Sequence, residues 1–208
     1  PPPGEVDNPD LVPFIVPDPD VLPGVVIDDT QARVIGQWQQ STHTPPYVGY
    51  SYIHDMKDGK GEKQIIFETK LPKSGMYEVR MSHCYNIRRA TNAPITIRHA
   101  DGETTLRINE QELPVHDKLF RTLGKFRFEK DALASVTISN EGTEGKYVIA
   151  DAVQFISIDE LKEREIKLAE LEKVRKQLLA KRREREDLNA QVARMKRYKL
   201  PPRAQAMA

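Results

Sequence analysis

The chain has 208 residues, of which 38% are hydrophobic and 30% charged, and its net charge of +1 gives no reason to expect a nucleic-acid or membrane partner. This length allows one domain with a real core plus an appendage, or two small domains. The single cysteine, Cys84, excludes an intramolecular disulfide and a zinc site of the usual cysteine type, and no apolar run is long enough to cross a membrane.

The first 24 residues are rich in proline and aspartate. Proline fixes φ and removes a backbone donor, so we expect neither a helix nor a central strand over 1–24. The composition predicts an extended linker, in which the apolar stretch 11–16 could pack on a neighbouring domain. Because the chain opens at Pro1 and not at methionine, we expect it to be a piece of a longer protein.

Residues 25–158 form short β-type runs separated by turn residues. In one run Tyr77, Val79 and Met81 share a face, and polar residues take the other face. The pair Asp101-Gly102 stands between two alternating runs and is the strongest hairpin signal. Many short strands without helical periodicity predict a mainly β protein, an antiparallel jelly-roll-like β-sandwich over 25–158. The expected strands are 25–28, 34–40, 49–54, 64–71, 76–83, 95–98, 104–109, 121–128, 135–139 and 147–157.

Residues 159–199 change to a helical period, which predicts a long, charged, amphipathic and coiled-coil-like helix. Asp159 stands where an N-cap is expected, and Lys162 at the third helical position gives no capping box. The prolines at 201–202 end the helix and leave a tail over 200–208. We expect its narrow apolar row to pack on a partner helix or on another part of the parent protein. The row consists of Leu161, Leu168, Leu171, Val174, Leu178, Leu188, Val192 and Met195.

Catalytic signatures are missing from the sequence. It has no Gly-rich phosphate loop, no nucleophile elbow and no His-Glu-x-x-His motif, so we expect a chain that is not an enzyme. The five histidines fall on different elements, and convergence of two of them at a metal stays open. His83 continues the face of Tyr77 and is expected to be a core histidine. Cys84 is expected to be a buried small hydrophobe rather than a nucleophile.

Several aromatic residues lie close together early in this region and are interleaved with small polar residues and histidines. Sugars bind with their C–H faces on aromatic rings while their hydroxyls bond to amides, hydroxyls and carboxylates. The alternative is that Trp38 and one or two of the tyrosines belong to the core. The candidate glycan surface consists of an aromatic platform with flanking polar groups: Trp38, Tyr47, Tyr50, His54, Asp55, Arg88 and Asn92.

Asp151 interrupts an apolar run, and strict alternation places it on the inward face beside Val153. A buried carboxylate needs a partner, for which Arg88 and Arg89 are the strongest candidates. We therefore expect an internal network of Arg89 and Asp151 rather than a ligand or metal site. No cofactor is expected, although Asp55 and Asp58 are clustered turn carboxylates that could hold a structural calcium.

Three motifs occur in the order found in one family. They are Arg89-Ala90-Thr91-Asn92-Ala93-Pro94, His99-Ala100-Asp101-Gly102 and the segment from Thr143 to Phe155. Over residues 25–156 the chain resembles the golvesin C-terminal-like domain, also described as the carbohydrate-binding-like domain of xanthan lyases. One departure is Lys146, an extra residue before Tyr147.

The resemblance implies a jelly-roll sandwich that accompanies other domains in large exported bacterial proteins, some of them lyases or flavin-dependent oxidoreductases. It also implies a periplasmic or secreted location.

Two functions compete at this point. One is a non-catalytic accessory module that binds polysaccharide, which requires aromatic residues exposed on one surface. The other is a structural or protein-interaction module whose helix docks onto a parent enzyme, a partner subunit or a second copy, which requires buried aromatics and a covered helical row. Neither involves nucleic acid or a membrane span.

Overall fold

The computed structural model describes residues 17–116 and 118–197 of the chain. The chain divides into two units after Glu160: the first is a β-sandwich and the second carries most of a long helix. The expected fold class, an antiparallel jelly-roll-like sandwich followed by a C-terminal helix, is confirmed.

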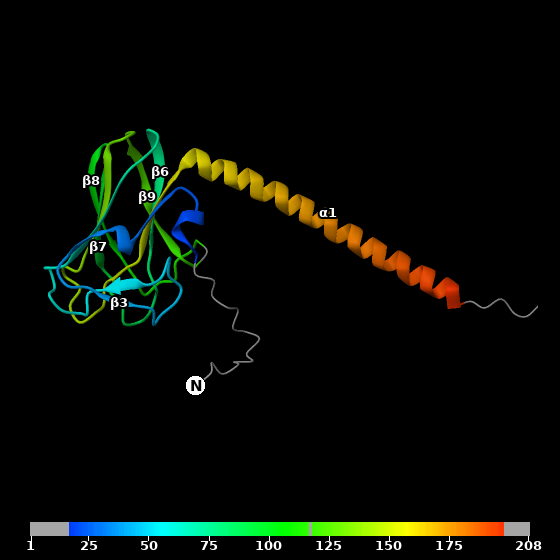
Figure 1. Cartoon of the computed structure of the whole chain (residues 1–208), viewed down its shortest axis with the longest axis horizontal. Helices are drawn as coiled ribbons and strands as arrows, with labels where there is room; N and C mark the ends of the chain where they lie inside the picture. The colour runs from blue at the N-terminus through cyan, green and yellow to red at the C-terminus, as the bar shows by residue number, and fades with distance from the viewer. Residues whose placement is uncertain (1–16, 117, 198–208) are drawn as a thin grey trace, which may run out of the picture. The chain divides into compact units, whose positions relative to one another are not determined.

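Two antiparallel sheets form the sandwich. One has the strand order β1-β12-β6-β9 and the other has the order β2-β5-β10-β7-β8. Figure 1 shows β7 and β8 on one side of the sandwich and β6 and β9 on the other. The strands are β1 Val25–Asp28, β2 Arg33–Ile35, β5 Gln64–Lys70, β6 Gly75–Ser82, β7 Ala93–His99, β8 Gly102–Ile108, β9 Phe120–Phe128, β10 Leu133–Ser139 and β12 Ala152–Ser157.

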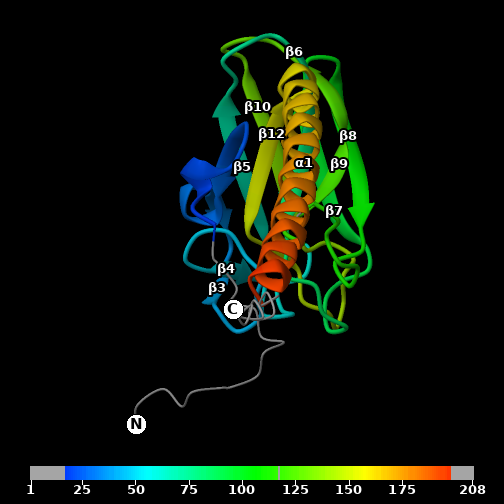
Figure 2. The same cartoon turned by 90° about the vertical axis from the view of Figure 1, so that its right-hand side faces the viewer.

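A third, small sheet has the order β11-β4-β3 and lies at one end of the sandwich (Figures 1 and 2). Its strands are β3 Gln39–Ser41, β4 Tyr52–His54 and β11 Ile149–Ala150. Two single strands expected from the sequence are therefore each split between two sheets. The first breaks after β2, where Gly36 has a φ of +78°, and the second breaks at Asp151. These breaks build the end of the sandwich that carries the candidate site.

The expected hairpin joins β7 to β8. His99 pairs with Gly102, so the two loop residues are Ala100 and Asp101, and Gly102 begins β8 with a φ of +122°. Arg127 holds the loop from β9, since its guanidinium lies 2.6 Å from Asp101 Oδ1. The hairpin is confirmed, with its turn one residue earlier than an Asp-Gly loop.

The core lies between the two large sheets. Tyr77, Val79 and Met81 are all buried there, as their alternation predicts. They pack with residues of β5, β7, β10 and β12. A second cluster consists of Val48, Leu119, Phe120 and Ala152. Strand β12 is therefore buried along nearly all of its length. Burial of this apolar area, at about 25 cal/mol per Å², is the main force that holds the sheets together.

Of the N-terminal segment expected to be a linker, residues 1–16 lie outside the described residues. A one-turn 3₁₀ helix, η1, spans Pro19–Val21, with Asp18 accepting from the Asp20 N–H. A second one-turn helix, η2, spans Asp29–Gln31. The linker residues next to the sandwich are bonded to it, since Pro17 O accepts from Gly49 N at 3.0 Å and Pro23 O accepts from Gln154 Nε2 at 2.8 Å.

The helix α1 spans Ile158–Arg197 and is uninterrupted in Figure 2. It begins before Asp159: Ser157 Oγ accepts from the Glu160 N–H at 3.1 Å, so Ser157 and not Asp159 caps it. The residue at the third helical position is therefore Glu160, whose carboxylate accepts from Gly24 N instead of closing a capping box. None of the helices in the described part of the chain is both long and apolar enough to span a membrane.

Candidate functional site

The aromatic residues expected to form one platform are separated in the structure. Trp38 packs against the core and donates from Nε1 to Ile35 O at 3.1 Å. Tyr47 is half-buried, with its ring centroid 5.9 Å from that of Tyr52. Tyr50 is 90% exposed and lies in a different hollow, beside Pro17 and Pro19. The expectation of a shared platform is wrong, because Trp38 packs on the core whereas Tyr50 is exposed at a different hollow.

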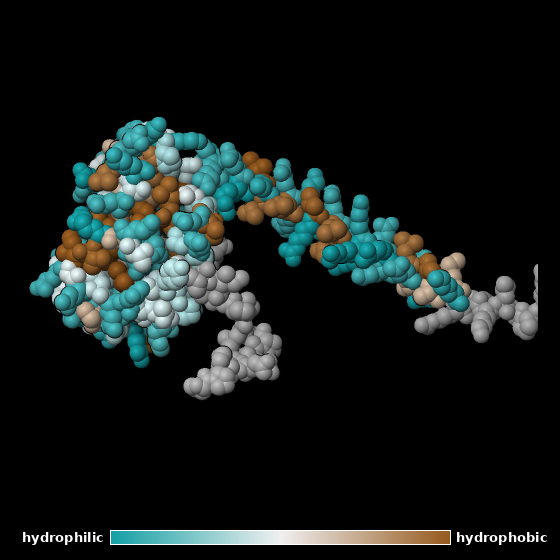
Figure 3. Space-filling model, in the orientation of Figure 1, coloured by the Kyte–Doolittle hydropathy of each residue, from teal (hydrophilic) through white to brown (hydrophobic). Residues whose placement is uncertain are grey.

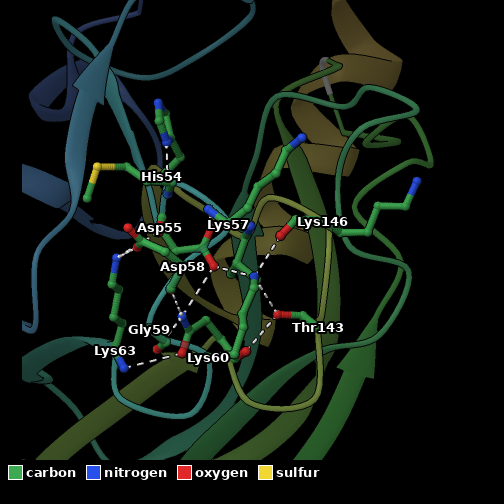
Figure 4. A network of polar contacts seen from close by, with 12 residues as sticks. His54, Asp55, Lys57, Asp58, Gly59, Lys60, Lys63, Thr143 and Lys146 are labelled. Atoms are coloured by element: carbon green, nitrogen blue, oxygen red, sulfur yellow. Dashed lines mark hydrogen bonds and ion pairs between the residues drawn. The ribbon is translucent and has the colours of Figure 1, made fainter.

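Asp55 is the centre of a buried network rather than a surface ligand contact (Figure 4). Its Oδ2 lies 2.5 Å from Lys60 Nζ and accepts from Asn140 Nδ2 at 3.2 Å. Its Oδ1 accepts from the backbone N–H groups of Lys57 and Val148 at 3.1 and 3.0 Å. The side chain has no exposed surface. Its assignment to a glycan surface is therefore corrected to a structural role.

In the same network, the carboxylates of Asp55 and Asp58, which were considered as calcium ligands, are already paired. Lys60 pairs with Asp55, and Lys63 pairs with Asp58. Lysine ammonium groups thus neutralise both carboxylates that a calcium would need. Within residues 17–116 and 118–197 no group of three or more His, Cys, Asp or Glu residues is placed to hold a metal ion.

A polar groove of about 430 Å³ lies beside this network, at the end of the sandwich formed by the small sheet. One wall comes from β3, β4 and their connection, and is formed by Ser41, His43, Thr44, Tyr52 and His54. The other wall comes from the segment between β6 and β7 and from Tyr147, two residues before β11. Its residues are Asn86, Ile87, Arg88, Arg89 and Tyr147.

Backbone pairing between distant segments brings the two arginines to the groove. Tyr147 N donates to Arg88 O at 3.1 Å, and Ala90 N donates to Tyr147 O at 2.8 Å, which makes an isolated parallel bridge between Arg89 and Tyr147. Across the groove, Ser41 pairs with Tyr52 in the β3–β4 register, and their hydroxyls lie 3.2 Å apart. The groove is therefore set by strand register and not by neighbouring positions in the sequence.

Arg89 is a buried member of the groove, with 6% of its surface exposed. Its Nε donates to Cys84 O at 3.3 Å, and Nη2 lies 3.5 Å from the hydroxyl oxygens of Thr44 and Tyr52. Its guanidinium carbon is 5.6 Å from the ring centroid of Tyr147. Hydroxyls, a carbonyl and aromatic faces surround this cation, and it forms no ion pair with a carboxylate in the described part of the chain.

Two further side chains, Lys57 and His54, contact the ring of Tyr147. Lys57 Nζ lies 4.5 Å from the ring centroid, and His54 meets the ring edge-on with centroids 5.1 Å apart. Burial and the charge of Arg89 lower the pKa of His54 below its ordinary value, so this imidazole is neutral at pH 7. Neutral imidazole, phenol and hydroxyl groups beside guanidinium groups offer many hydrogen bonds to a polar ligand.

Asp151 does not pair with either arginine, so the expected Arg89–Asp151 network is wrong. Its carboxylate accepts from Val48 N at 3.1 and 3.2 Å and from the hydroxyl of Ser82. Burial is the main cause that raises the pKa of Asp151 to about 8, and the Asp28 charge adds to it. Burial and the Asp28 charge likewise raise the pKa of Asp29 to about 8. The three carboxyls form a second buried polar cluster.

The remaining candidate residues lie away from the groove or in the core. Asn92 donates from Nδ2 to Gly142 O at 2.6 Å and does not line the groove. His83 is buried with Nε2 3.1 Å from Glu112 O, and burial lowers its pKa to about 4. Cys84 is buried, and burial raises the pKa of its thiol to about 11, so it is a poor nucleophile. Both are core residues, as expected.

Only part of the groove follows from the sequence. His54 and Arg88 were expected at a ligand surface and do line it. Tyr147, Tyr52, Asn86 and Arg89 were not expected there. The only sequence signal for two of them is their place in the family-like motifs, since Arg89 opens the first motif and Tyr147 lies in the last.

Comparison with known proteins agrees with this fold. The model of the Golvesin C-terminal domain matches residues 25–157. A xanthan lyase of Bacillus sp. (strain GL1) is 31% identical over 142 residues, which are 66% of this chain and 15% of that protein. The chain thus corresponds to a small part of this relative.

Solved structures also match. The structure of a Paenibacillus xanthan lyase aligns with a TM-score of 0.59 and 31% identity, over 64% of this chain and 13% of that one. A family 35 carbohydrate binding module from Clostridium thermocellum aligns with a TM-score of 0.45 and 12% identity, over 64% of this chain and 97% of that one.

Proposed function

The chain belongs to the Golvesin C-terminal domain family, and on that premise we propose that its sandwich is a non-catalytic accessory module that binds polysaccharide in the polar groove. The observation that carries this proposal is the groove itself, with hydroxyl, amide, imidazole and guanidinium groups on facing walls. These are the groups that bond to sugar hydroxyls. The similarity to two xanthan lyases supports a polysaccharide as ligand and an extracytoplasmic location.

The test is affinity electrophoresis of the full chain through gels that contain acidic or neutral polysaccharides. We expect retardation by at least one polymer. The double variant His43→Ala/Arg88→Ala should weaken it by about tenfold or more, since hydrogen bonds to charged groups contribute about 1.5–3 kcal/mol. Both side chains are exposed, so their removal should leave the fold intact.

Tyr50→Ala is the matched control, because Tyr50 is the most exposed aromatic in the described residues and lies outside the groove. We expect it to bind like the unchanged chain. Loss of binding in Tyr50→Ala alone would move the site to the other hollow. Absorbance of an unsaturated sugar product during incubation would contradict the non-catalytic role.

A second candidate function is association through α1, and the exposed apolar row on this helix favours it (Figure 3). From Leu168 to Met195 the row's side chains are 45% to 74% exposed. Arg175, Arg182 and Arg185 interrupt it, so self-association should be weak.

The expected result is a reversible dimer in sedimentation equilibrium that the double variant Leu171→Glu/Leu178→Glu abolishes. A chain that stays monomeric at all concentrations would contradict self-association. The variant Lys173→Glu is the control, because it changes one exposed charge without removing an apolar side chain of the row.

A further inference from the structure

We infer that the groove recognises the carboxylate of an acidic sugar, such as a uronic acid unit, with Arg89 and Arg88 as its receptors. This inference rests on the proposed function and specifies its ligand class. It follows from the charges around the groove, from the state of Arg89 and from the occupied faces of the Tyr147 ring.

The groove is lined by positive and neutral groups alone. Its walls include Arg88 and Arg89, and none of its lining residues is an aspartate or a glutamate. Two further cations lie at its edge: Lys57 is over the Tyr147 ring, and Lys146 Nζ donates to Ile87 O at 3.2 Å. Asp55, next to His54, is buried and already paired with Lys60. The local field therefore favours an anion although the whole chain is nearly neutral.

The guanidinium of Arg89 is buried, which is costly for a charged group, yet it has no ion-pair partner among the described residues. A guanidinium has five N–H donors, yet Arg89 makes only long contacts of 3.3 to 3.5 Å through Nε and Nη2. Nη1 makes no hydrogen bond to a described residue, and no ion pair to Arg89 is found among residues 17–116 and 118–197. A carboxylate in the groove would supply the short, charge-assisted bonds that the protein itself does not.

Glu110 is not the carboxylate partner of Arg89. Its carboxyl is fully buried and accepts from Ile149 N at 3.0 Å, and it is not within ion-pair distance of Arg89. Burial raises the pKa of Glu110 well above its ordinary range, although the Arg89 charge opposes this. Glu110 therefore forms no ion pair with Arg89, and it does not supply the short, charge-assisted bonds that the guanidinium lacks.

The aromatic faces in the groove are not open for sugar stacking. Lys57 and Arg89 both lie over the Tyr147 ring, and Arg89 also lies over the Tyr52 ring with its guanidinium carbon 5.8 Å from the centroid. A ligand would meet cations before it met a ring. Charge and hydrogen bonds therefore select the ligand, and the geometry favours a planar carboxylate that can pair with a guanidinium fork.

The first arm of the test compares polygalacturonate with the same polymer after full methyl esterification, by affinity electrophoresis and titration calorimetry on the full chain. Esterification removes the carboxylate charge and keeps the sugar backbone. We expect binding to the acid form to be at least about tenfold tighter. Alginate and its carboxyl-reduced form serve as a second matched pair. Equal binding to the acid and the neutral form of each pair would overturn the inference.

The second arm places a charge at the rim of the groove. Ile87 lines the groove and is 79% exposed, so its side chain can be changed without opening the core. We expect Ile87→Glu to abolish binding of the acid polymer, and the isosteric Ile87→Gln to retain it. Arg88→Ala should weaken binding at least about tenfold. Arg98→Ala is the control, because Arg98 is an exposed arginine on β7 outside the groove.

The outcomes separate the two proposals. Binding to neutral polymers that His43→Ala/Arg88→Ala abolishes would keep the proposed function and overturn the acidic ligand. Acid-polymer binding that Arg98→Ala weakens as much as Arg88→Ala does would show a diffuse ionic attraction and overturn the specific receptor. The absence of binding to any polymer, acidic or neutral, would overturn both.

Discussion

Replacement of Asp55 by alanine is expected to destabilise the sandwich by about 3–5 kcal/mol, as removal of one partner of a buried ion pair does. The Lys60 ammonium would lose its carboxylate while its side chain stays only 13% exposed. The backbone N–H groups of Lys57 and Val148 and the Asn140 amide would lose an acceptor as well. The measurement is the free energy of unfolding from urea denaturation followed by circular dichroism.

Asp101→Ala is the matched control for this change. Asp101 also pairs with a cation, Arg127, at 2.6 Å, but both side chains are about half exposed, at 57% and 44%. Solvent screens an exposed pair, which therefore contributes little to stability, so this variant should unfold near the midpoint of the unchanged chain. If Asp55→Ala and Asp101→Ala had the same small effect, the Asp55 network would not stabilise the fold.

The stability of the sandwich is expected to fall as pH rises from about 6.5 to 8, because of Asp29 and Asp151. Both have a folded-state pKa of about 8, whereas an unfolded aspartate titrates near 3.9. Between these values the folded chain holds protons that the unfolded chain has released. Each such group lowers stability by about 1.4 kcal/mol per pH unit as pH rises. The stabilisation is fully present below about pH 4 and lost once pH passes the folded pKa of about 8.

Above pH 6.5, His83 does not contribute to the change in stability that Asp29 and Asp151 cause. The pKa of His83 is lowered to about 4, so its contribution is lost only as pH falls below the unfolded histidine value of about 6.5. We expect a loss on the order of 2–4 kcal/mol between pH 6.5 and 8 in urea denaturation.

Asp29→Asn tests the assignment of this pH dependence. An amide cannot ionise and can still donate to Asp28, so the variant should be more stable than the unchanged chain at pH 8 and show a shallower pH dependence. The exposed Asp20→Asn is the control and should leave the profile unchanged. A profile that rises from pH 6.5 to 8, or an Asp29→Asn profile identical to that of the unchanged chain, would contradict this account.

Local patterns in the sequence predicted most of the strands. Alternation placed Tyr77, Val79 and Met81 in the core, and the β7–β8 hairpin formed where Asp101 and Gly102 indicated it. These features depend on residues near one another in the chain, whose side chains alternate between faces with a period of two. The long helix followed in the same way from its periodicity, apart from its cap at Ser157.

The breaks in two expected strands did not follow from the pattern. Residues 34–40 and 147–157 were each expected to form one strand, but each divides between two sheets. A run of suitable residues does not specify which strand it will pair with, because pairing depends on segments far away in sequence. The small sheet that results positions the groove.

The sequence by itself therefore determined the fold class, the core faces, the hairpin, the helix and the family. Only the tertiary structure decided the site. It dispersed Trp38, Tyr47 and Tyr50, buried Asp55 against Lys60, and gave Asp151 partners other than Arg89. It also brought Arg89 next to Tyr147 through an isolated parallel β-bridge, although the two residues are far apart in the sequence. The physical reason is that periodicity reports which side of a strand is buried, whereas a site depends on which distant charges and donors become neighbours after the sheets pair.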